Sequence, residues 1–406
     1  MKLLYVHQYF RTPDEGGANR SYYVAKALVA AGHEVTMLTA HDESQIKTKV
    51  IEKVNVVYLP VPYDNSLGFW GRIKAFLSFV TKAKSWLAQQ HNFDKCIATS
   101  TPLTVGLIAT WLKKNYQVPF VFEVRDLWPE APIQMGVIRN PILKKVLRRV
   151  ERTIYEQADQ IIALSPGMRN HIEKIVPEKE VNLIPNMADC DFFHPNQQKN
   201  EDLELHYGVK GKFVISYFGA VGPVNDLMSL VKSAEYCLDL PIRFLVMGSG
   251  KSLLSIKKYV KAHEISNVFF IPFGTKEEVR DVMQITDACY VSFLHKAILR
   301  TNSPNKFFDA IAAGKLIITN IQGWIRGLVE KRNFGIYADS DIPVELREKI
   351  IPFLESKELL RKYQSNARET GEQFFSRAEL CQQFVCVVEG KRQTFKMQDQ
   401  IFSLSA

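Results

Sequence analysis

The sequence predicts an α/β protein made of two doubly wound domains, and three observations support this prediction. The chain has 406 residues, which is enough for two separate hydrophobic cores. Residues 2–39 read as a strand, a glycine-containing loop, a helix and a second strand, the usual opening of a doubly wound domain. The same order begins again at residue 213, after a polar stretch. We therefore expect four parts: an N-terminal domain over 1–188, a linker over 189–206, a C-terminal domain over 207–373 and a terminal helix over 374–406.

The composition is that of a soluble globular protein, with 46% hydrophobic and 23% charged residues. No apolar run is long enough to span a membrane, and the first residues read as a strand rather than a signal peptide. The six cysteines are scattered without a CxxC pair, which is typical of core thiols in a cytosolic protein. The net charge of +9 favours anionic partners, which are nucleic acid, an anionic membrane surface or phosphorylated substrates.

A pair of glycines, Gly16 and Gly17, lies in the loop between the first predicted strand (2–9) and the first predicted helix (20–31). Glycine lets a backbone approach a ligand closely, and a helix N-terminus attracts anions. The pair lacks the third glycine of the dinucleotide fingerprint, so the loop gives no support for NAD binding. A substrate-binding loop and a plain turn are both open interpretations.

Residues 67–87 predict a basic amphipathic helix with aromatic residues at its edges, a pattern typical of helices that bind a membrane surface. The alternative is a core helix whose lysines point to solvent. A second basic helix is expected over 138–155, with a charge density that suits anionic head groups or a polyprenyl diphosphate. The residues that we expect to contact an anionic membrane are Phe69, Trp70, Arg72 and Lys74.

The predicted strand over 120–124 ends in Arg125 and Asp126, followed by Trp128 and Glu130. Functional residues in open α/β sheets gather just past the carboxyl ends of strands, so this position favours a site. The alternative is an ion pair between Arg125 and Asp126 that only braces the loop.

The most informative stretch is 301–323, which reads as a loop, a helix, a strand and a turn. Ser303 and Pro304 predict the helix start, as the N-cap and the first helical residue. A helix start carries unpaired N–H groups and the positive end of the macrodipole, and Lys306 adds a charge that suits a diphosphate. Asp309, one turn later, is placed to accept hydrogen bonds from a ribose diol. The alternative is an ordinary amphipathic helix with both side chains solvated.

The run Asn-Ser-Pro-Asn-Lys-Phe-Phe-Asp at 302–309, followed by Ala-Ala-Gly-Lys at 312–315, resembles the donor-binding segment of glycosyltransferase family four. More narrowly, it resembles the bacterial branch that builds O-antigen and capsule, including N-acetylfucosamine-type aminosugar transferases. The resemblance spans nearly the whole chain. It implies the GT-B arrangement, in which two doubly wound domains face each other across a cleft and a C-terminal helix crosses back onto the first domain.

The resemblance also implies roles for individual residues. The donor-binding residues would be Gly219, Gly222, Gly248, Gly250, Asn302, Ser303, Pro304, Asn305, Lys306 and Asp309. The acceptor side of the cleft would hold Gly16, Gly17, Trp128 and Glu130, and the catalytic residues would be Arg125, Asp126 and Lys306.

The chain departs from the family pattern at three places. The family usually carries two glutamates eight positions apart; Asp309 matches the second, but Thr301 stands at the first. Arg125 stands where many relatives have a histidine. The positions at which relatives often carry a diphosphate-binding arginine and lysine read Asn225, Asp226 and Leu227. The positive charge must then come from Lys306, Lys251 or Arg300.

Together these features predict a retaining glycosyltransferase of bacterial surface polysaccharide assembly. It would move an N-acetylated or deoxy aminosugar from a UDP-sugar to a saccharide on a polyprenyl diphosphate, at the cytoplasmic face of the plasma membrane. No carboxylate nucleophile is well placed, which favours front-face displacement, in which the departing phosphate oxygen takes the acceptor's proton. We identify no DxD pair in the loops where a metal would bridge a diphosphate, so we expect no metal and no cofactor besides the donor. The alternatives are a UDP-sugar 2-epimerase or hydrolase of the same fold, and nucleic-acid binding, which only the net charge supports.

Overall fold

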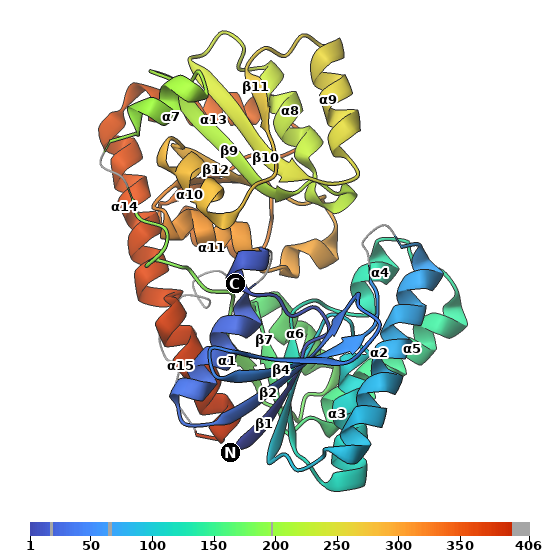
Figure 1. Ribbon diagram of the computed structural model, residues 1–406. Helices are drawn as coiled ribbons and strands as arrows, with labels where there is room; N and C mark the ends of the chain where they lie inside the picture. The colour runs from blue at the N-terminus through green and yellow to red at the C-terminus, as the bar shows by residue number, and fades with distance from the viewer. Residues whose placement is uncertain (17–18, 64–66, 196–197, 392–406) are drawn as a thin grey trace. The chain divides into compact units, whose positions relative to one another are not determined.

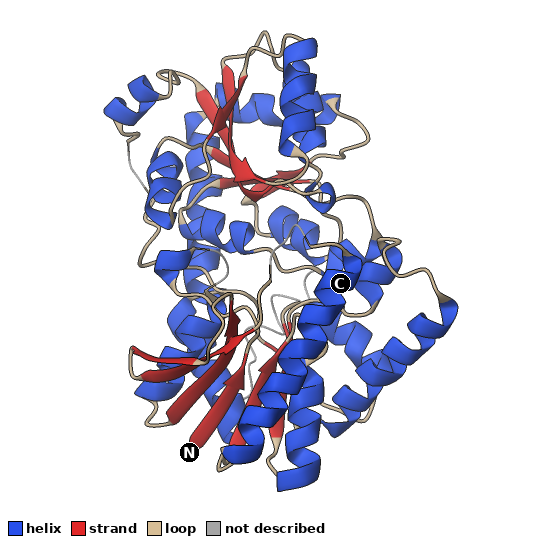
Figure 2. Ribbon diagram, turned by 45° about the vertical axis from the view of Figure 1, so that its right-hand side comes forward, coloured by secondary structure: helices blue, strands red, loops and turns tan. Residues whose placement is uncertain are grey.

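The computed structural model describes residues 1–16, 19–63, 67–195 and 198–391, and it divides into two compact units. In the described chain, the first unit consists of residues 1–185 with 378–391, and the second consists of residues 186–377. Each unit is a Rossmann-like α/β domain whose strands form the middle layer and whose helices cover both faces (Figure 1, Figure 2).

The first unit has an eight-stranded sheet in the order β3-β4-β2-β1-β5-β6-β7-β8. All neighbouring strands are parallel except β3 and β4, which form an antiparallel pair at one edge. The central strands are apolar along their length because helices bury both faces of a parallel sheet. The strands are β1 Lys2–Val6, β2 Glu34–His41, β3 Lys47–Ile51, β4 Val54–Pro60, β5 Lys95–Thr99, β6 Phe120–Val124, β7 Gln160–Ala163 and β8 Val181–Leu183.

The helices of the first unit connect these strands. They are the short η1 Pro13–Glu15, then α1 Arg20–Ala30, α2 Phe69–Gln89, α3 Val105–Tyr116, α4 Glu130–Gln134, α5 Pro141–Gln157 and α6 Pro166–Ile175. In the described part of the chain, no helix combines the length and the apolar composition that crossing a bilayer needs.

The second unit has a six-stranded sheet, with parallel pairing throughout, in the order β11-β10-β9-β12-β13-β14. Successive strands are added on one side of β9 up to β11 and on its other side from β12 to β14, so the strand order reverses between β9 and β12. Ligands in such sheets bind beside this point, past the carboxyl ends of the strands. The strands are β9 Phe213–Ala220, β10 Ile242–Ser249, β11 Val268–Ile271, β12 Ala288–Val291, β13 Leu316–Thr319 and β14 Gly335–Tyr337.

The helices of the second unit enclose a core of buried apolar residues from the sheet and from α8, α9 and α13. They are α7 Glu201–His206, η2 Pro223–Asn225, α8 Leu227–Glu235, α9 Leu253–Ala262, α10 Lys276–Gln284, η3 Ala297–Thr301, α11 Asn305–Ala312, α12 Trp324–Lys331, α13 Val344–Glu355 and α14 Lys357–Phe374.

The C-terminal part of the chain corrects one prediction. We expected the terminal helix to begin at residue 374, but α14 extends to Phe374 and the terminal helix, α15 Arg377–Glu389, begins three residues later. α15 packs on the first unit: the Phe384 ring stacks on Tyr5 of β1 with 6.4 Å between ring centroids, and Lys95 Nζ donates to the Val388 carbonyl over 2.6 Å.

Candidate active site

The segment between β12 and β13 carries most of the predicted donor-binding residues, and two hydrogen bonds hold its first part. The indole N–H of Trp324 donates to the carbonyl of Asn302 over 3.0 Å, and the side-chain amide of Asn186 donates to the carbonyl of Ser303 over 2.6 Å. The predicted helix start was wrong by one residue. Pro304 occupies the N-cap position with extended backbone, and α11 begins at Asn305.

Lys306 lies in the first turn of α11 with its ammonium group buried. Its Nζ is 3.9 Å from the centroid of the Tyr217 ring, on β9, and in the described part of the chain no hydrogen-bond partner reaches it. Burial lowers the pKa of Lys306 to about 7, because an apolar surrounding disfavours the charged form. The ring face offers a weak attraction that does not replace a counter-ion. The alternative of a solvated Lys306 is therefore wrong.

The loop after β9 lies beside this lysine. A Cβ added to Gly219, whose φ is +112°, would meet only one atom within 4 Å, the Cε of Lys306 at 3.9 Å. The hydroxyl of Tyr217 donates to the carbonyl of Ala220, and the side-chain oxygen of Asn225 accepts from the N–H of Gly222 over 3.1 Å. The structure thus brings the predicted donor residues Gly219 and Lys306 together, and Tyr217 contacts both Lys306 and the loop after β9.

Gly248 and Gly250 are required by close backbone packing between two loops. A Cβ at Gly248 would collide with the carbonyl oxygen of Gly219, and a Cβ at Gly250 would collide with that of Val221. Gly250 also has a φ of +151°, which side-chain-bearing residues rarely adopt. These two glycines therefore allow the loops after β9 and β10 to pack backbone against backbone.

Asp309 lies one turn after Lys306 on α11. Burial raises the pKa of Asp309 to about 7, while Lys276 lowers it and Asp189 raises it. Lys276 itself forms an ion pair with Asp189, with 2.6 Å between Nζ and Oδ2. The carboxylate of Asp189 therefore offsets much of the effect of Lys276 on Asp309. Near neutral pH the Asp309 carboxyl can therefore accept or donate hydrogen bonds.

The residues at the departures from the family pattern have structural partners or lie in solvent. Asp226 accepts from the side-chain amide of Asn320 over 3.1 Å, and the Thr301 hydroxyl donates to the carbonyl of Ile298 over 2.7 Å. Lys251 and Arg300 are exposed. Lys306 is thus the only one of the three predicted cations whose ammonium or guanidinium group is described as buried and without a hydrogen-bond partner.

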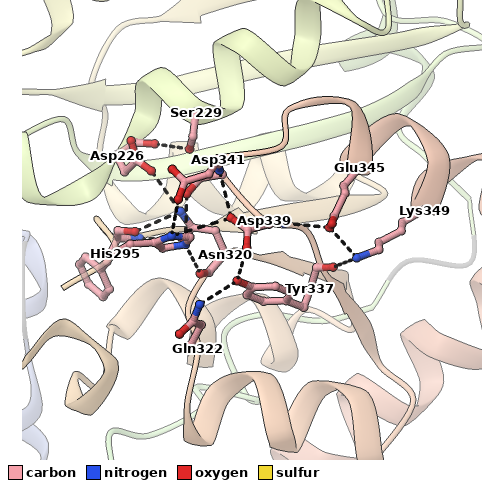
Figure 3. Close-up of polar contacts among 12 residues, drawn as sticks. Asp226, Ser229, His295, Asn320, Gln322, Tyr337, Asp339, Asp341, Glu345 and Lys349 are labelled. Carbon is pink, nitrogen blue, oxygen red and sulfur yellow. Dashed lines mark hydrogen bonds and ion pairs between the residues drawn. The ribbon is translucent and has the colours of Figure 1, made fainter. Parts of the chain in front are cut away.

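A polar network past the ends of β12, β13 and β14 contains the residues best able to hold a metal in the described chain, His295, Asp339 and Asp341 (Figure 3). One ligand atom from each lies within 4.8 Å of the others. Two of these side chains already have hydrogen-bond partners within the protein. Asp339 accepts from the N–H of Asp341 over 3.0 Å and from the Tyr337 hydroxyl over 3.2 Å. His295 contacts the Ser340 hydroxyl and the Asn320 carbonyl. Asp339, Ser340 and Asp341 form a DxD pair just past β14, which was overlooked in the sequence.

In the first unit, Arg125 and Asp126 follow β6. The N–H of Arg125 donates to the Ser100 hydroxyl over 3.0 Å, and its guanidinium lies 3.5 Å from Nε2 of His7, at the end of β1. No ion pair joins Arg125 to Asp126 in the described structure, so the bracing pair that we considered as an alternative is absent. Burial raises the pKa of Asp126 to about 6, and Arg125 opposes the rise.

The other residues predicted for the acceptor side have structural roles. Glu130 binds Arg148 of α5 over 2.9 Å, and the Trp128 ring packs edge-on against Phe76 of α2 with 6.2 Å between centroids. Gly16 ends η1 with a φ of +68°, where its N–H donates to the Pro13 carbonyl. Gly17 and the side chain of Phe69 lie outside the described part of the structure.

The predicted membrane-binding helix α2 has two different sides. One stripe is buried in the first unit, with Phe76, Phe79, Val80 and Leu87 in the core, as the core-helix alternative expected. Trp70, in contrast, is 77% exposed, Lys74 is exposed, and Arg72 donates to the Leu67 carbonyl.

The helix α5 is more exposed to solvent than α2, and none of its first ten residues is buried. Ile142 is 73% exposed and Val146 52% exposed, among basic residues that include Lys145, Arg148 and Arg149. Glu151, Ile154 and Tyr155, near its C-terminal end, anchor the helix in the core.

Comparison with known proteins identifies the class. Residues 15–187 match the family described as glycosyl transferase 4-like domain, and residues 200–370 match glycosyl transferases group 1. These two matches, one in each half, together cover most of the chain. The protein therefore belongs to the glycosyltransferases of this group and has the GT-B fold.

Individual relatives are distant. The probable glycosyltransferase WbjE of Pseudomonas aeruginosa is 22% identical over 291 residues, covering 71% of this chain and 72% of its own length. HepE of Anabaena, solved with UDP and glucose, superposes with a TM-score of 0.71 at 16% identity, covering 96% of this chain and 99% of that one. WaaG, described as a glycosyltransferase involved in lipopolysaccharide biosynthesis, gives a TM-score of 0.70 at 15% identity, covering 96% and 100%.

Two residues of these sites were missed from the sequence. Tyr217 lies in a buried and mostly apolar strand, so its sequence context gives no sign of a functional role. The contact of its ring with Lys306 depends on how α11 packs beside β9. His7 lies at the end of β1, two strands away from β6 in the sheet, with β5 between them. A histidine at the carboxyl end of the first strand was the available signal for His7.

Proposed function

We propose that the protein is a retaining glycosyltransferase that uses a UDP-sugar. The acceptor would be a polyprenyl-diphosphate-linked saccharide in the assembly of a bacterial surface polysaccharide, and the sugar an N-acetylated or deoxy aminosugar. The observation that carries the proposal is the buried ammonium of Lys306, at the start of α11 and beside Gly219, which has no hydrogen-bond partner in the described chain.

A donor diphosphate accounts for this arrangement. The first N–H groups of α11 have no helical partner and point toward the helix start, and the macrodipole is positive there. An oxygen of the diphosphate near Gly219 would form an ion pair with Lys306 and restore its charge. That interaction strengthens as the sugar leaves and negative charge grows on the phosphate, so it stabilises the transition state more than the ground state.

The reaction itself would proceed on the face of the sugar that the phosphate leaves. The departing phosphate oxygen takes the proton of the acceptor hydroxyl while that hydroxyl attacks, so no separate nucleophile is required. Arg125 and Asp126 would orient the acceptor, and Asp309 would bind the ribose. We expect no metal to be needed, because Lys306 and the helix start supply the positive charge.

A lipid-linked acceptor fits the exposed surface of α5 and the first turn of α2. Exposed apolar side chains, Trp70, Ile142 and Val146, lie on basic helices, and such helices bind anionic head groups while inserting their apolar residues. A peripheral position at the inner face of the plasma membrane would bring the protein to its acceptor. WaaG, whose fold this chain shares, is described as acting in lipopolysaccharide biosynthesis.

The experiment is to follow UDP release from a panel of UDP-sugars with and without a synthetic prenyl-diphosphate saccharide. A transferase releases UDP only when the acceptor is present. A UDP-sugar hydrolase or 2-epimerase of the same fold would release UDP or isomerise the donor without any acceptor, and that result would replace this proposal.

A further inference from the structure

The contact between His7 and Arg125 is unusual for an arginine near the carboxyl edge of a sheet. The Arg125 guanidinium lies 3.5 Å from His7 Nε2, and the backbone N–H of Arg125 is fixed by Ser100, at the end of the intervening strand β5. His7 is 5% exposed, whereas Arg125 is only half-buried. The imidazole of His7 thus contacts the guanidinium of Arg125, and part of the arginine residue remains exposed.

The chemistry of the two groups fixes the tautomer of His7. An arginine side chain can only donate hydrogen bonds, so in this contact Nε2 of His7 accepts and the proton is on Nδ1, a buried atom without a hydrogen-bond partner in the described structure. Burial, and then the charge of Arg125, hold the pKa of His7 well below its usual value. His7 is therefore a neutral anchor over the physiological pH range.

Arg125 interacts electrostatically with Glu123 and Asp126, but neither carboxylate forms an ion pair with it in the described structure. Glu123, the buried carboxylate of β6, is bound to Arg20 over 2.7 Å and to the Thr99 hydroxyl over 2.6 Å. Asp126 is adjacent in sequence but forms no ion pair with Arg125 in the described structure. A carboxylate in the place of His7 would hold the guanidinium equally well but would cancel its charge.

We propose that His7 positions Arg125, a cation that forms no ion pair in the described structure, to bind a phosphate oxygen of a substrate diphosphate. The inference rests on the proposed function, because both of its substrates contain a diphosphate. Arginine binds phosphate oxygens through paired N–H groups, and its planar guanidinium must be oriented for this. A neutral anchor supplies the orientation and keeps the charge for the ligand.

The test uses the full chain and two probes, UDP for the donor and farnesyl diphosphate for the acceptor, with affinities measured by calorimetry. Arg125→Met should weaken binding of one of the two probes about tenfold, consistent with the loss of a charged hydrogen bond. Which probe is affected identifies the substrate whose diphosphate Arg125 binds. Lys114→Met, which removes an exposed cation of α3 in the same unit, is the matched control and should change neither affinity.

Substitutions of His7 separate positioning from mere packing. His7→Gln keeps a neutral acceptor for Arg125 and should bind the affected probe within about threefold of the wild type. His7→Glu should lose as much affinity as Arg125→Met, because the new ion pair neutralises the arginine. If His7→Glu does not fold, the affinities of Arg125→Met and the tautomer of His7 decide whether the inference holds.

The tautomer is measured by NMR on protein labelled with ¹⁵N-histidine, and needs neither donor nor acceptor. We expect a neutral His7 with its proton on Nδ1 from pH 6 to 8, and a shift of its signals when the affected diphosphate is added. A proton on Nε2, or unchanged affinities for both probes in Arg125→Met, would overturn the inference. Failure of the wild type to transfer sugar would instead count against the proposed function, and the two failures are therefore distinguishable.

Discussion

The ammonium nitrogen of Lys306 lies 3.9 Å from the centroid of the Tyr217 ring and has no hydrogen-bond partner in the described chain. Tyr217 is fully buried, and its hydroxyl donates to Ala220 in the loop that faces the lysine. Burial lowers the pKa of Lys306 to about 7, so the diphosphate that we propose to bind there would raise this pKa and favour protonation.

Lys306→Ala should lower the transfer rate by about 10²-fold, the effect typical of removing one electrostatic group from a transition state. The measurement is kcat with a saturating donor. Lys258→Ala, which removes an exposed lysine of α9 in the same unit, is the matched control and should keep the wild-type rate. An unchanged rate in Lys306→Ala would assign the charge to Lys251 or Arg300.

Donor binding should take up a proton at pH 8. The unliganded Lys306 has a pKa of about 7 and is mostly neutral at this pH, while a bound diphosphate raises its pKa and protonates it. Affinity for UDP should therefore fall as the pH rises above 7. The uptake is measured by calorimetry in buffers of different ionisation enthalpy, and it should vanish in Lys306→Met.

Asp309 contributes little to that signal, because its pKa is also about 7 and its carboxyl is mostly ionised at pH 8. A wild-type protein that binds UDP without proton uptake at pH 8 would show that Lys306 does not meet the diphosphate.

Asp309→Asn should weaken UDP binding by about tenfold, since a charged acceptor of ribose hydrogen bonds is lost. Calorimetry with UDP and with 2′-deoxy-UDP gives the decisive comparison. If Asp309 binds the ribose diol, the substitution costs less affinity for the deoxy ligand than for UDP. Equal losses for the two ligands would remove Asp309 from the ribose site.

Trp70→Ser combined with Ile142→Ser should release the protein from anionic liposomes and leave UDP binding intact. A buried aromatic or large aliphatic side chain contributes about 1.5–3 kcal/mol, and each basic residue near an anionic surface adds about 1 kcal/mol. Flotation should also weaken as salt rises, because the charge contribution is screened.

Val50→Ser is the control for this pair, because Val50 is an exposed apolar residue on the edge strand β3. Its liposome binding should match that of the wild type. A double variant that binds UDP and still floats with liposomes would contradict the membrane proposal for α2 and α5.

Chelation of divalent cations should leave the transfer rate unchanged. Lys306 and the start of α11 supply the positive charge, and His295 and Asp339 already form hydrogen bonds within the protein. The rate is measured with EDTA and after adding back magnesium or manganese. A chelator-sensitive rate that is restored by metal and lost in His295→Ala would place a functional cation at this network.

The fold was predictable because its signals are local. Apolar runs of four to eight residues, bounded by glycine and proline, define most strands, and their order alone implies a doubly wound topology. The start of α15 was predicted three residues too early because the helical composition continues across the break after α14. The start of α11 was predicted one residue too early because proline also suits an N-cap with extended backbone.

The environment of each site residue was not predictable from spacing. Lys306 and Asp309 were found by their place on a helix, but their burial depends on β9 and α10, which come earlier in the chain. Gly248 and Gly250 matched a ligand-binding pattern, yet the contact that requires them is with the neighbouring loop. The partner of Arg125 lies 118 residues away, at the end of β1.

The most direct test of the central claim is mass spectrometry of a prenyl-diphosphate-linked acceptor after incubation with a panel of UDP-sugars, followed by NMR of the product. We predict that the acceptor gains the mass of one sugar residue, an N-acetylated or deoxy aminosugar, and that the new bond keeps the anomeric configuration of the donor. An inverted linkage would contradict the front-face mechanism. An acceptor that gains no sugar from any UDP donor, with a protein that still binds UDP, would contradict the assignment as a UDP-sugar transferase.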